Sequence, residues 1–216
     1  MRDNIRRVMA LCLLALASGC ATTADVDPYE NLNRPIMEFN DSVDSISLQP
    51  IAQAYVDLIP KGGRKVVRNF FANLAYPNVV INQFLQGKVK MGVSDTVRFL
   101  LNTTIGIGGL FDVATRWGLA AHYEDFGQTF AAWGVSSGPY LVVPFWGPVT
   151  ARDAIGDLFD ALAFPTYYLN DVVLRNSLTA GWAVDRRAAV LEAETLIGGD
   201  RYLFIRDAYL QHREFL

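Results

Sequence analysis

The chain has 216 residues, of which 51% are hydrophobic and 19% charged, and its formal net charge is −3. This length suits one domain with a sizeable core, and such high hydrophobicity argues against an intrinsically disordered chain. The acidic total excludes nucleic acid as the main partner, because nucleic-acid phosphates are bound by basic surfaces.

The N-terminus carries the parts of a bacterial lipoprotein signal in the expected order. Arg2, Arg6 and Arg7 form a basic segment, and residues 8–17 are an apolar run too short to span a bilayer. Small residues then precede Cys20, as in the lipobox that directs cleavage and attachment of diacylglycerol to the cysteine. We therefore expect lipidation at Cys20, although an ordinary secretory signal followed by a chance cysteine would show the same order.

This signal sets the expected domain organisation and location. Residues 1–19 are predicted to be a removed signal peptide, 20–26 a lipidated tether and 27–216 a single domain. One of the two cysteines falls inside the signal and the other carries the lipid, so we expect no disulfide and no cysteine-based metal site. Ala21 follows the lipidated position, and in Gram-negative bacteria a residue other than Asp there implies sorting to the outer membrane.

Helical periodicity begins just after the tether. Asp27 is a candidate N-cap, with Pro28 at the first helical position. Pro35 interrupts the pattern, so the helix either kinks there or begins later, near Asn33. The apolar face of this helix is predicted to contain Leu32, Ile36, Phe39 and Val43.

The same periodicity continues to the C-terminus, and prolines, glycines and capping residues divide it into helices. No strand-rich region, repeat or low-complexity segment is found, so the predicted class is all-α. The further helices are expected at residues 50–58, 77–87, 88–104, 124–133 and 183–197, with one more after a cap at Thr150 and one after a cap at Asp200.

Two stripes of different character run along the helical pattern that follows Pro60. A stripe of cations beside a stripe of large apolar side chains is typical of a helix at a membrane interface. A core-facing helix with a solvated basic face would show the same pattern. The cations are Lys61, Arg64, Lys65 and Arg68, and the apolar stripe consists of Val67, Phe70, Phe71 and Leu74.

Two glycine-containing segments interrupt the helices. Gly106, Gly108 and Gly109 permit positive φ or close packing, and their spacing matches neither a dinucleotide fingerprint nor a P-loop. Residues 137–148 form an apolar run with three prolines, which excludes a helix interior and disfavours a central strand. We expect an extended loop or hairpin there, around which the helices are arranged.

One motif points to hydrolysis. Residues 134–138 match G-x-S-x-G, and Asp157 or Asp160 and then His212 follow Ser136 in the order of a lipase triad. The motif requires a strand before the serine and a helix after it, whereas a helical segment precedes it here. We therefore expect no catalytic residues, no metal site and no cofactor, and a lipolytic serine hydrolase using Ser136 stays the enzymatic alternative.

Short motifs that occur in order from about Asp27 to the C-terminus resemble the MlaA (VacJ) family of outer-membrane lipoproteins. The resemblance rests on the lipobox and on Asn33-Arg34, Phe39-Asn40, Asn102-Thr103 with Gly106, Gly109 and Asp112, Phe126-Gly127-Gln128, Trp133-Gly134, Gly138-Pro139-Tyr140, Pro144, Gly147-Pro148, Arg152-Asp153 and Arg206-Asp207-Ala208-Tyr209.

This resemblance implies a ring of amphipathic helices in the inner leaflet of the outer membrane, on its periplasmic side, with a central amphipathic channel. It implies a non-enzymatic role in which mislocalised phospholipids are removed from the outer leaflet, beside a trimeric porin. The lipid then passes to a soluble periplasmic carrier resembling MlaC, which maintains outer-membrane lipid asymmetry. A structural lipoprotein that only binds a porin is the non-transport alternative.

The resemblance gives the unusual segments candidate roles. The apolar loop could line or gate the lipid path without offering unpaired donors to lipid, the cationic stripe could hold phosphates at the interface, and the glycines could act as a hinge. A turn, a solvated face and tight packing are the respective alternatives. The loop candidates are Pro139, Tyr140, Pro144, Phe145 and Trp146, and the interface candidates add Phe70 and Phe71 to the four cations.

Overall fold

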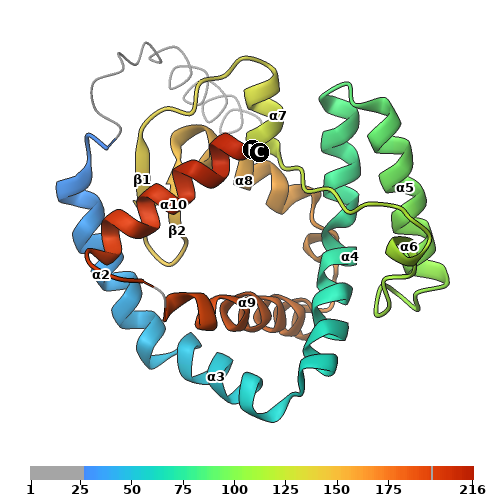
Figure 1. The fold of residues 1–216 in the computed structure, drawn as a ribbon, viewed down its shortest axis with the longest axis horizontal. Helices are drawn as coiled ribbons and strands as arrows, with labels where there is room; N and C mark the ends of the chain where they lie inside the picture. The colour runs from blue at the N-terminus through green and yellow to red at the C-terminus, as the bar shows by residue number, and fades with distance from the viewer. Residues whose placement is uncertain (1–26, 196) are drawn as a thin grey trace.

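The computed structural model describes residues 27–195 and 197–216, whose helices are arranged in a ring with a small hairpin on its inner side (Figure 1). The predicted all-α, ring-like architecture with a Pro/Gly hairpin is confirmed. In chain order the elements are α2 (Glu30–Ile46), α3 (Leu48–Leu58), α4 (Lys61–Leu85), α5 (Val89–Thr104), α6 (Val113–Arg116), α7 (Phe126–Ala132), β1 (Tyr140–Val143), β2 (Gly147–Thr150), α8 (Ala151–Ala163), the 3-10 turn η1 (Pro165–Tyr168), α9 (Val172–Glu194) and α10 (Arg201–Phe215).

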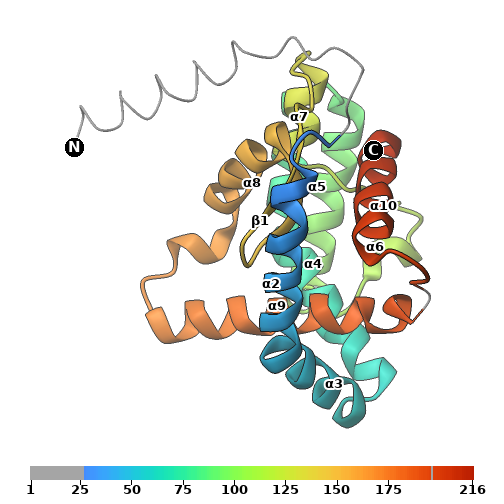
Figure 2. The ribbon, with the colours of Figure 1, turned by 90° about the vertical axis from the view of Figure 1, so that its left-hand side faces the viewer.

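The longest helices set the size of the ring. α4 packs against α5 on its outer side, and α9 runs beside α3 and then leads to α10 (Figures 1 and 2). α10 lies against the hairpin, so the last helix returns to the region where the described chain begins.

Within the described residues, Pro35 and Pro77 lie in helix interiors, and at Pro77 this contradicts the predicted boundary. α2 runs unbroken through Pro35 from Glu30, and α4 is one 25-residue helix through Pro77, so the prediction that a helix starts at Pro77 was wrong. An internal proline costs a helix about 3 kcal/mol. In α4 the residues on both sides of it, Tyr76 and Val79, are buried, and this packing offsets the cost.

Side-chain caps fix most helix starts. The predicted caps are confirmed: Thr150 accepts from the N–H of Asp153, and Asp200 caps α10. Asp171 caps α9, which therefore begins eleven residues before the predicted Ala183. At the first helix the N-cap position is held by Tyr29 without a side-chain hydrogen bond, so the capping role expected for Asp27 was wrong.

The predicted loop or hairpin at 137–148 is an antiparallel hairpin that spans Tyr140 to Thr150. Tyr140 lies opposite Thr150 and Val143 opposite Gly147. The turn places Phe145 at φ 63° and Gly147 at φ 102°, in the left-handed region that glycine adopts without strain. Pro139 and Pro144 flank β1, whereas Pro148 lies within β2 opposite Val142. The N–H of Val142 points away from β2 to Asn33, so this pair exchanges no ladder hydrogen bonds and a missing N–H at Pro148 costs little.

Candidate functional site

Buried polar and exposed apolar side chains characterise this chain. Among the described residues, buried polar and charged side chains outnumber buried hydrophobic ones, and Asn82, Gln83 and Asp95 are fully buried. Large apolar side chains are correspondingly exposed, with Leu58 at 78% and Ile46 at 81%. Within the described residues, no helix combines the length and hydrophobicity needed to span a bilayer. Large exposed apolar surfaces mark sites of interaction with other proteins, with membranes or with ligands.

The hairpin is fixed to α2 by asparagine side chains. Asn33, which is 1% exposed, donates from Nδ2 to the carbonyl oxygen of Tyr140 at 3.2 Å and accepts from the N–H of Val142 at 2.9 Å. Its amide thus replaces the neighbouring strand that the outer edge of β1 lacks. A buried backbone group left unpaired would cost about 1–3 kcal/mol.

Asn40 repeats this arrangement two helical turns later. It donates to the carbonyl of Val143 at 3.0 Å and accepts from the N–H of Phe145 at 2.7 Å. Seven residues advance an α-helix by about 10.5 Å, so Asn40 lies beyond the outer edge of β1 and binds the end of that strand and the turn that follows it. The turn is thereby held beside α2, where Phe39 contacts the ring of Phe145 edge-on.

Three tyrosines pack together between the hairpin and α10. Tyr140 is 1% exposed and its ring lies 6.3 Å from that of Tyr202 and 6.0 Å from that of Tyr209. The Tyr209 hydroxyl donates to Asp153 at 2.8 Å, and the Tyr202 hydroxyl donates to Asp27. Burial, with the nearby carboxylate of Asp153, raises the pKa of Tyr209. Both hydroxyls therefore act as donors that join the start of the described chain, α8 and α10.

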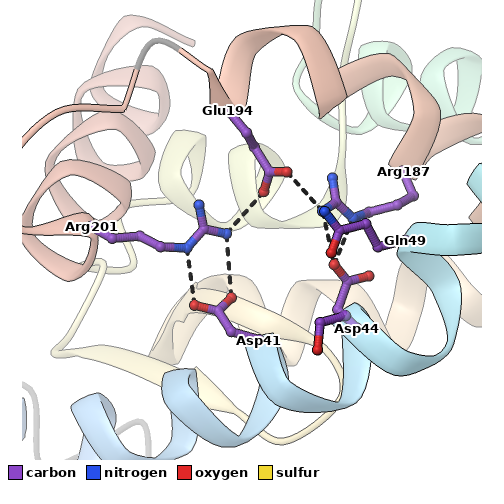
Figure 3. A pocket seen from close by; sticks show the side chains of 7 residues that line it. Asp41, Asp44, Gln49, Arg187, Glu194 and Arg201 are labelled. Atoms are coloured by element: carbon purple, nitrogen blue, oxygen red, sulfur yellow. Dashed lines mark hydrogen bonds and ion pairs between the residues drawn. The ribbon is translucent and has the colours of Figure 1, made fainter. Parts of the chain in front are cut away.

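A chain of alternating charges joins α2, α9 and α10 (Figure 3). We name it the ionic seam. Arg201 binds Asp41 and Glu194 at 2.9 Å each, while Arg187 binds Asp44 at 2.8 Å and Glu194 at 2.7 Å. The five side chains line a cavity of about 250 Å³. Burial opposes ionisation of Glu194, but hydrogen bonds from both arginines outweigh it and lower its pKa.

The predicted loop candidates lie together in the hairpin. Tyr140 is buried in the core, whereas Pro144, Phe145 and Trp146 are exposed at the turn, Phe145 by 77%. Trp146 donates from its indole N–H to Asp157 at 3.0 Å. Pro139 is half-buried before β1. The turn thus exposes apolar side chains while hydrogen bonds to Asn40 and Asp157 hold it in place.

The predicted cationic stripe occupies the first turns of α4. Lys61, Lys65 and Arg68 are exposed, and Arg64 is half-buried. Beside them, the rings of Phe70 and Phe71 pack edge-on at 5.2 Å; Phe71 is buried and Phe70 is half-buried, and a membrane-interface role for this stripe stays a prediction. Among the described residues, no hydrogen bond or ion pair joins this stripe to the hairpin.

The glycine segment is tightly packed at two of its three positions. A Cβ on Gly106 would lie 2.3 Å from the carbonyl oxygens of Asn102 and Phe111, and one on Gly109 would lie 2.3 Å from the Asn73 side chain. Gly108, at φ 67°, has open space. Close packing thus accounts for Gly106 and Gly109, and hinge motion of the segment stays a prediction.

The serine motif lacks the context of a nucleophile elbow. Ser136 follows helix α7 instead of a strand and is exposed. Asp157 accepts from Trp146, and Asp160 accepts from Asn78 at 2.6 Å and from the N–H of Phe126. No group of residues suited to a metal ion is found within the described part. The proposed lipidation site, Cys20, lies outside the described residues.

Sequence reasoning missed a buried polar network between α4 and α5. Asp95 is fully buried and accepts from Tyr76 at 2.9 Å and Gln83 at 3.1 Å, and it contacts His122 Nδ1 at 2.9 Å. The helical periodicity of the sequence places none of Tyr76, Gln83 and Asp95 on a predicted buried face. Their burial depends on the packing of α5 along α4, for which the sequence carries no local signal.

Comparisons with known proteins agree with this architecture. The family model described as "MlaA lipoprotein" matches residues 25–216. The "Intermembrane phospholipid transport system lipoprotein MlaA" of Shigella flexneri is 36% identical, and the alignment covers 97% of this chain and 88% of that protein. The protein of the same description from Escherichia coli K12 is 35% identical over the same shares.

A solved structure shares the fold. It was reported in work on the "structural basis for maintenance of bacterial outer membrane lipid asymmetry", and it superposes with a TM-score of 0.76 at 34% identity, covering 88% of this chain and 98% of that one. Relatives also occur in Rickettsia, for example one in Rickettsia bellii that is 38% identical over 91% of this chain and 78% of that protein. The chain therefore belongs to the MlaA lipoprotein family.

Proposed function

We propose that this chain is a lipoprotein of an intermembrane phospholipid-transport system at the outer membrane. In this role it extracts mislocalised phospholipids from the outer leaflet and so maintains lipid asymmetry. The family relationship over nearly the whole described chain carries the proposal, since relatives bear that name. The ring built from α2, α3, α4, α8 and α9 is compatible with it (Figure 1).

The distribution of polarity supports the same role. A phospholipid that leaves a bilayer must move a polar head group while its acyl chains stay in apolar surroundings. Exposed apolar side chains such as Ile46 and Leu58 suit contact with acyl chains, and the buried polar side chains within the ring keep the fold intact in such surroundings. We place the chain in the inner leaflet, anchored through lipid on Cys20.

The hairpin turn is the proposed contact along the lipid path. Pro144, Phe145 and Trp146 present apolar surface there, and Asn33 and Asn40 hold the strand behind them. Apolar side chains without free donors would let acyl chains pass with little desolvation cost. The tight turn at 105–112 is the proposed point of flexing.

We further propose two protein partners, a trimeric porin and a soluble periplasmic carrier resembling MlaC. The porin would hold the ring at the outer membrane, and the carrier would accept the lipid on the periplasmic side. No covalent bond of the lipid changes in this scheme, so no catalytic residue and no cofactor are assigned. The placement of Ser136 after helix α7 supports this.

The proposal is tested by labelling surface phosphatidylethanolamine on intact cells with a membrane-impermeant amine reagent. Three strains are compared: one with the wild-type gene, one with the gene deleted and one carrying Ser136→Ala. We expect excess surface label in the deletion strain alone. Excess label in both mutants would indicate a hydrolase that uses Ser136, and no excess in either would contradict a transport role and leave a porin-binding lipoprotein.

A further inference from the structure

The start of α4 is where cations without ion-pair partners gather. Most arginines of the described chain are ion-paired, including the three between α2, α9 and α10. Lys61, Arg64 and Lys65 have no ion-pair partner within residues 27–195 and 197–216. The remaining unpaired cations are scattered, at Lys90, Arg116, Arg175 and Arg186.

Arg64 adds an observation inside this cluster. Its Nε atom is shielded from solvent and has no hydrogen-bond partner among the described residues. Arg98 and Arg213 have the same kind of shielded atom, so Nε is not the ligand contact; an anion at the surface would instead meet the terminal nitrogens of Arg64, which are not shielded in this way. Arg68, the next cation along this face of α4, differs from Arg64 because it is paired with Asp185 at 3.6 Å, and Asp185 also accepts from Tyr55 at 3.1 Å.

The N-terminus of α4 adds positive electrostatic potential to that of Lys61, Arg64 and Lys65. Pro60 occupies the N-cap of α4 without any side-chain hydrogen bond, so the first N–H groups of the helix lack a capping acceptor. Gly62 in this first turn is exposed, and nothing lies within 4 Å of where its Cβ would be. The N-terminus of a helix carries partial positive charge that favours anions.

Exposed apolar side chains lie on the helix that precedes these cations in the chain. Leu58 is 78% exposed and Ile51 55% exposed on α3, which immediately precedes the cluster. α3 lies at one end of the molecule (Figure 2). Cations next to exposed aliphatic side chains match the boundary between head groups and acyl chains of a bilayer. We name this surface, made of Leu58, Lys61, Arg64 and Lys65, the α3–α4 corner.

We propose that the α3–α4 corner binds the phosphate groups of anionic phospholipids at the bilayer surface. Arg64 and the two lysines contact the phosphates, and the neighbouring leucine enters the acyl boundary. The bilayer is the occupant because soluble anions would give no reason for the exposed apolar residues beside the cations. The proposal rests on the membrane association in the proposed function, and it adds a head-group preference.

The test uses the full chain reconstituted in nanodiscs of phosphatidylethanolamine with a minor share of phosphatidylglycerol. Native mass spectrometry of the released protein counts the two lipids that it retains. The test variant combines Lys61→Gln, Arg64→Gln and Lys65→Gln, and the matched control combines Lys90→Gln, Arg116→Gln and Arg175→Gln. Glutamine keeps helix propensity, and circular dichroism checks that both variants fold.

We expect the wild-type chain and the control to retain phosphatidylglycerol about tenfold above its share of the nanodisc, because each cation near an anionic surface contributes severalfold. The corner variant is expected to retain it near that share. Equal enrichment in the corner variant and the wild type would overturn the proposal, as would equal loss in the control.

A further arm separates lipid from soluble phosphate. Inorganic phosphate is added to the wild-type nanodiscs and compared with chloride at the same ionic strength. Unchanged enrichment relative to chloride supports lipid as the ligand, whereas loss specific to phosphate would assign the corner to a soluble anion. The surface-labelling assay reports on transport independently, so a failure of the corner proposal is distinguishable from a failure of the transport proposal.

Discussion

α2 is attached to the rest of the ring in two different ways. Toward the hairpin, Asn33 and Asn40 pair with backbone groups of β1, and Asn33 is almost fully buried. Toward α9 and α10, the ionic seam uses charged side chains, and Arg201 and Asp41 are each about two-fifths exposed. Both attachments join segments more than a hundred residues apart.

The difference predicts which joint is strong and which responds to solution conditions. Neutral hydrogen bonds to buried backbone groups leave unpaired groups when broken, so removing one is costly and insensitive to salt. Ion pairs near the surface lose much of their strength to screening by salt and side-chain entropy. We therefore expect the hairpin to remain a fixed part of the ring under conditions that loosen the ionic seam.

The largest effect is expected for Asn33→Ala. The substitution leaves the Tyr140 carbonyl and the Val142 N–H without their partner in a buried site, and it also removes the hydrogen bond that Asn33 donates to the buried Asp27 carboxylate. It should lower the free energy of unfolding by about 3 kcal/mol. Denaturant unfolding in detergent measures this. Asn31→Ala, at an exposed position on the same helix, is the control and should change stability by less than about 0.5 kcal/mol. Equal effects of the two variants would mean that the amide does not hold the strand.

Within the ionic seam, Arg187→Gln should have the next largest effect. The Arg187 side chain is 11% exposed and serves both Asp44 and Glu194, so its loss leaves two carboxylates short of a cation. We expect a loss of about 2 kcal/mol, below the cost of breaking a fully buried pair because the carboxylates retain some solvent. Arg175→Gln, on the same helix without an ion pair, should be nearly neutral in the same unfolding experiment. A neutral Arg187→Gln variant would show that the ionic seam contributes nothing.

Asn40→Ala should be milder than Asn33→Ala. The bonds of Asn40 lie at the hairpin turn, where Phe145 is exposed and its N–H can find water. The expected loss is about 1 kcal/mol, together with greater proteolytic sensitivity at the turn. A loss equal to that of Asn33→Ala would remove the distinction between the base and the tip of the hairpin.

The smallest effect is the pH dependence of the ionic seam. The pKa of Glu194 is lower in the folded chain than the ordinary 4.5. Its contribution is therefore fully present above about pH 4.5 and is lost as the pH falls through the folded-state value. We expect Glu194→Gln to cost less than about 1 kcal/mol at neutral pH and nothing in acid or high salt. The cost of Asn33→Ala should not vary with salt, and a parallel decline of both would contradict the comparison.

The sequence is sufficient to predict the helical class, the hairpin region and two helix caps, because periodicity, proline and capping chemistry are local. It does not predict that α4 passes through Pro77, because the packing of Tyr76 and Val79 against distant segments offsets the local cost. Local preferences are overridden wherever burial supplies more free energy than the backbone loses.

The attachments of α2 are the part of the candidate site that sequence reasoning could not reach. The seven-residue spacing of Asn33 and Asn40 shows that they share a helix face, but nothing in it names β1 as their partner. The charges of the ionic seam likewise come from three helices. Only the three-dimensional arrangement shows that Arg187 and Arg201 meet the carboxylates of α2.

The central claim is that this chain transports phospholipid without cleaving it. This claim is tested most directly by following the lipid itself. Isotopically labelled phosphatidylethanolamine is placed in the outer leaflet of cells with and without this gene, and the lipid that leaves the surface is identified by mass. We predict intact phosphatidylethanolamine, recovered in a gene-dependent manner and unchanged by Ser136→Ala. Gene-dependent lysophospholipid and free fatty acid that disappear in Ser136→Ala would contradict the account.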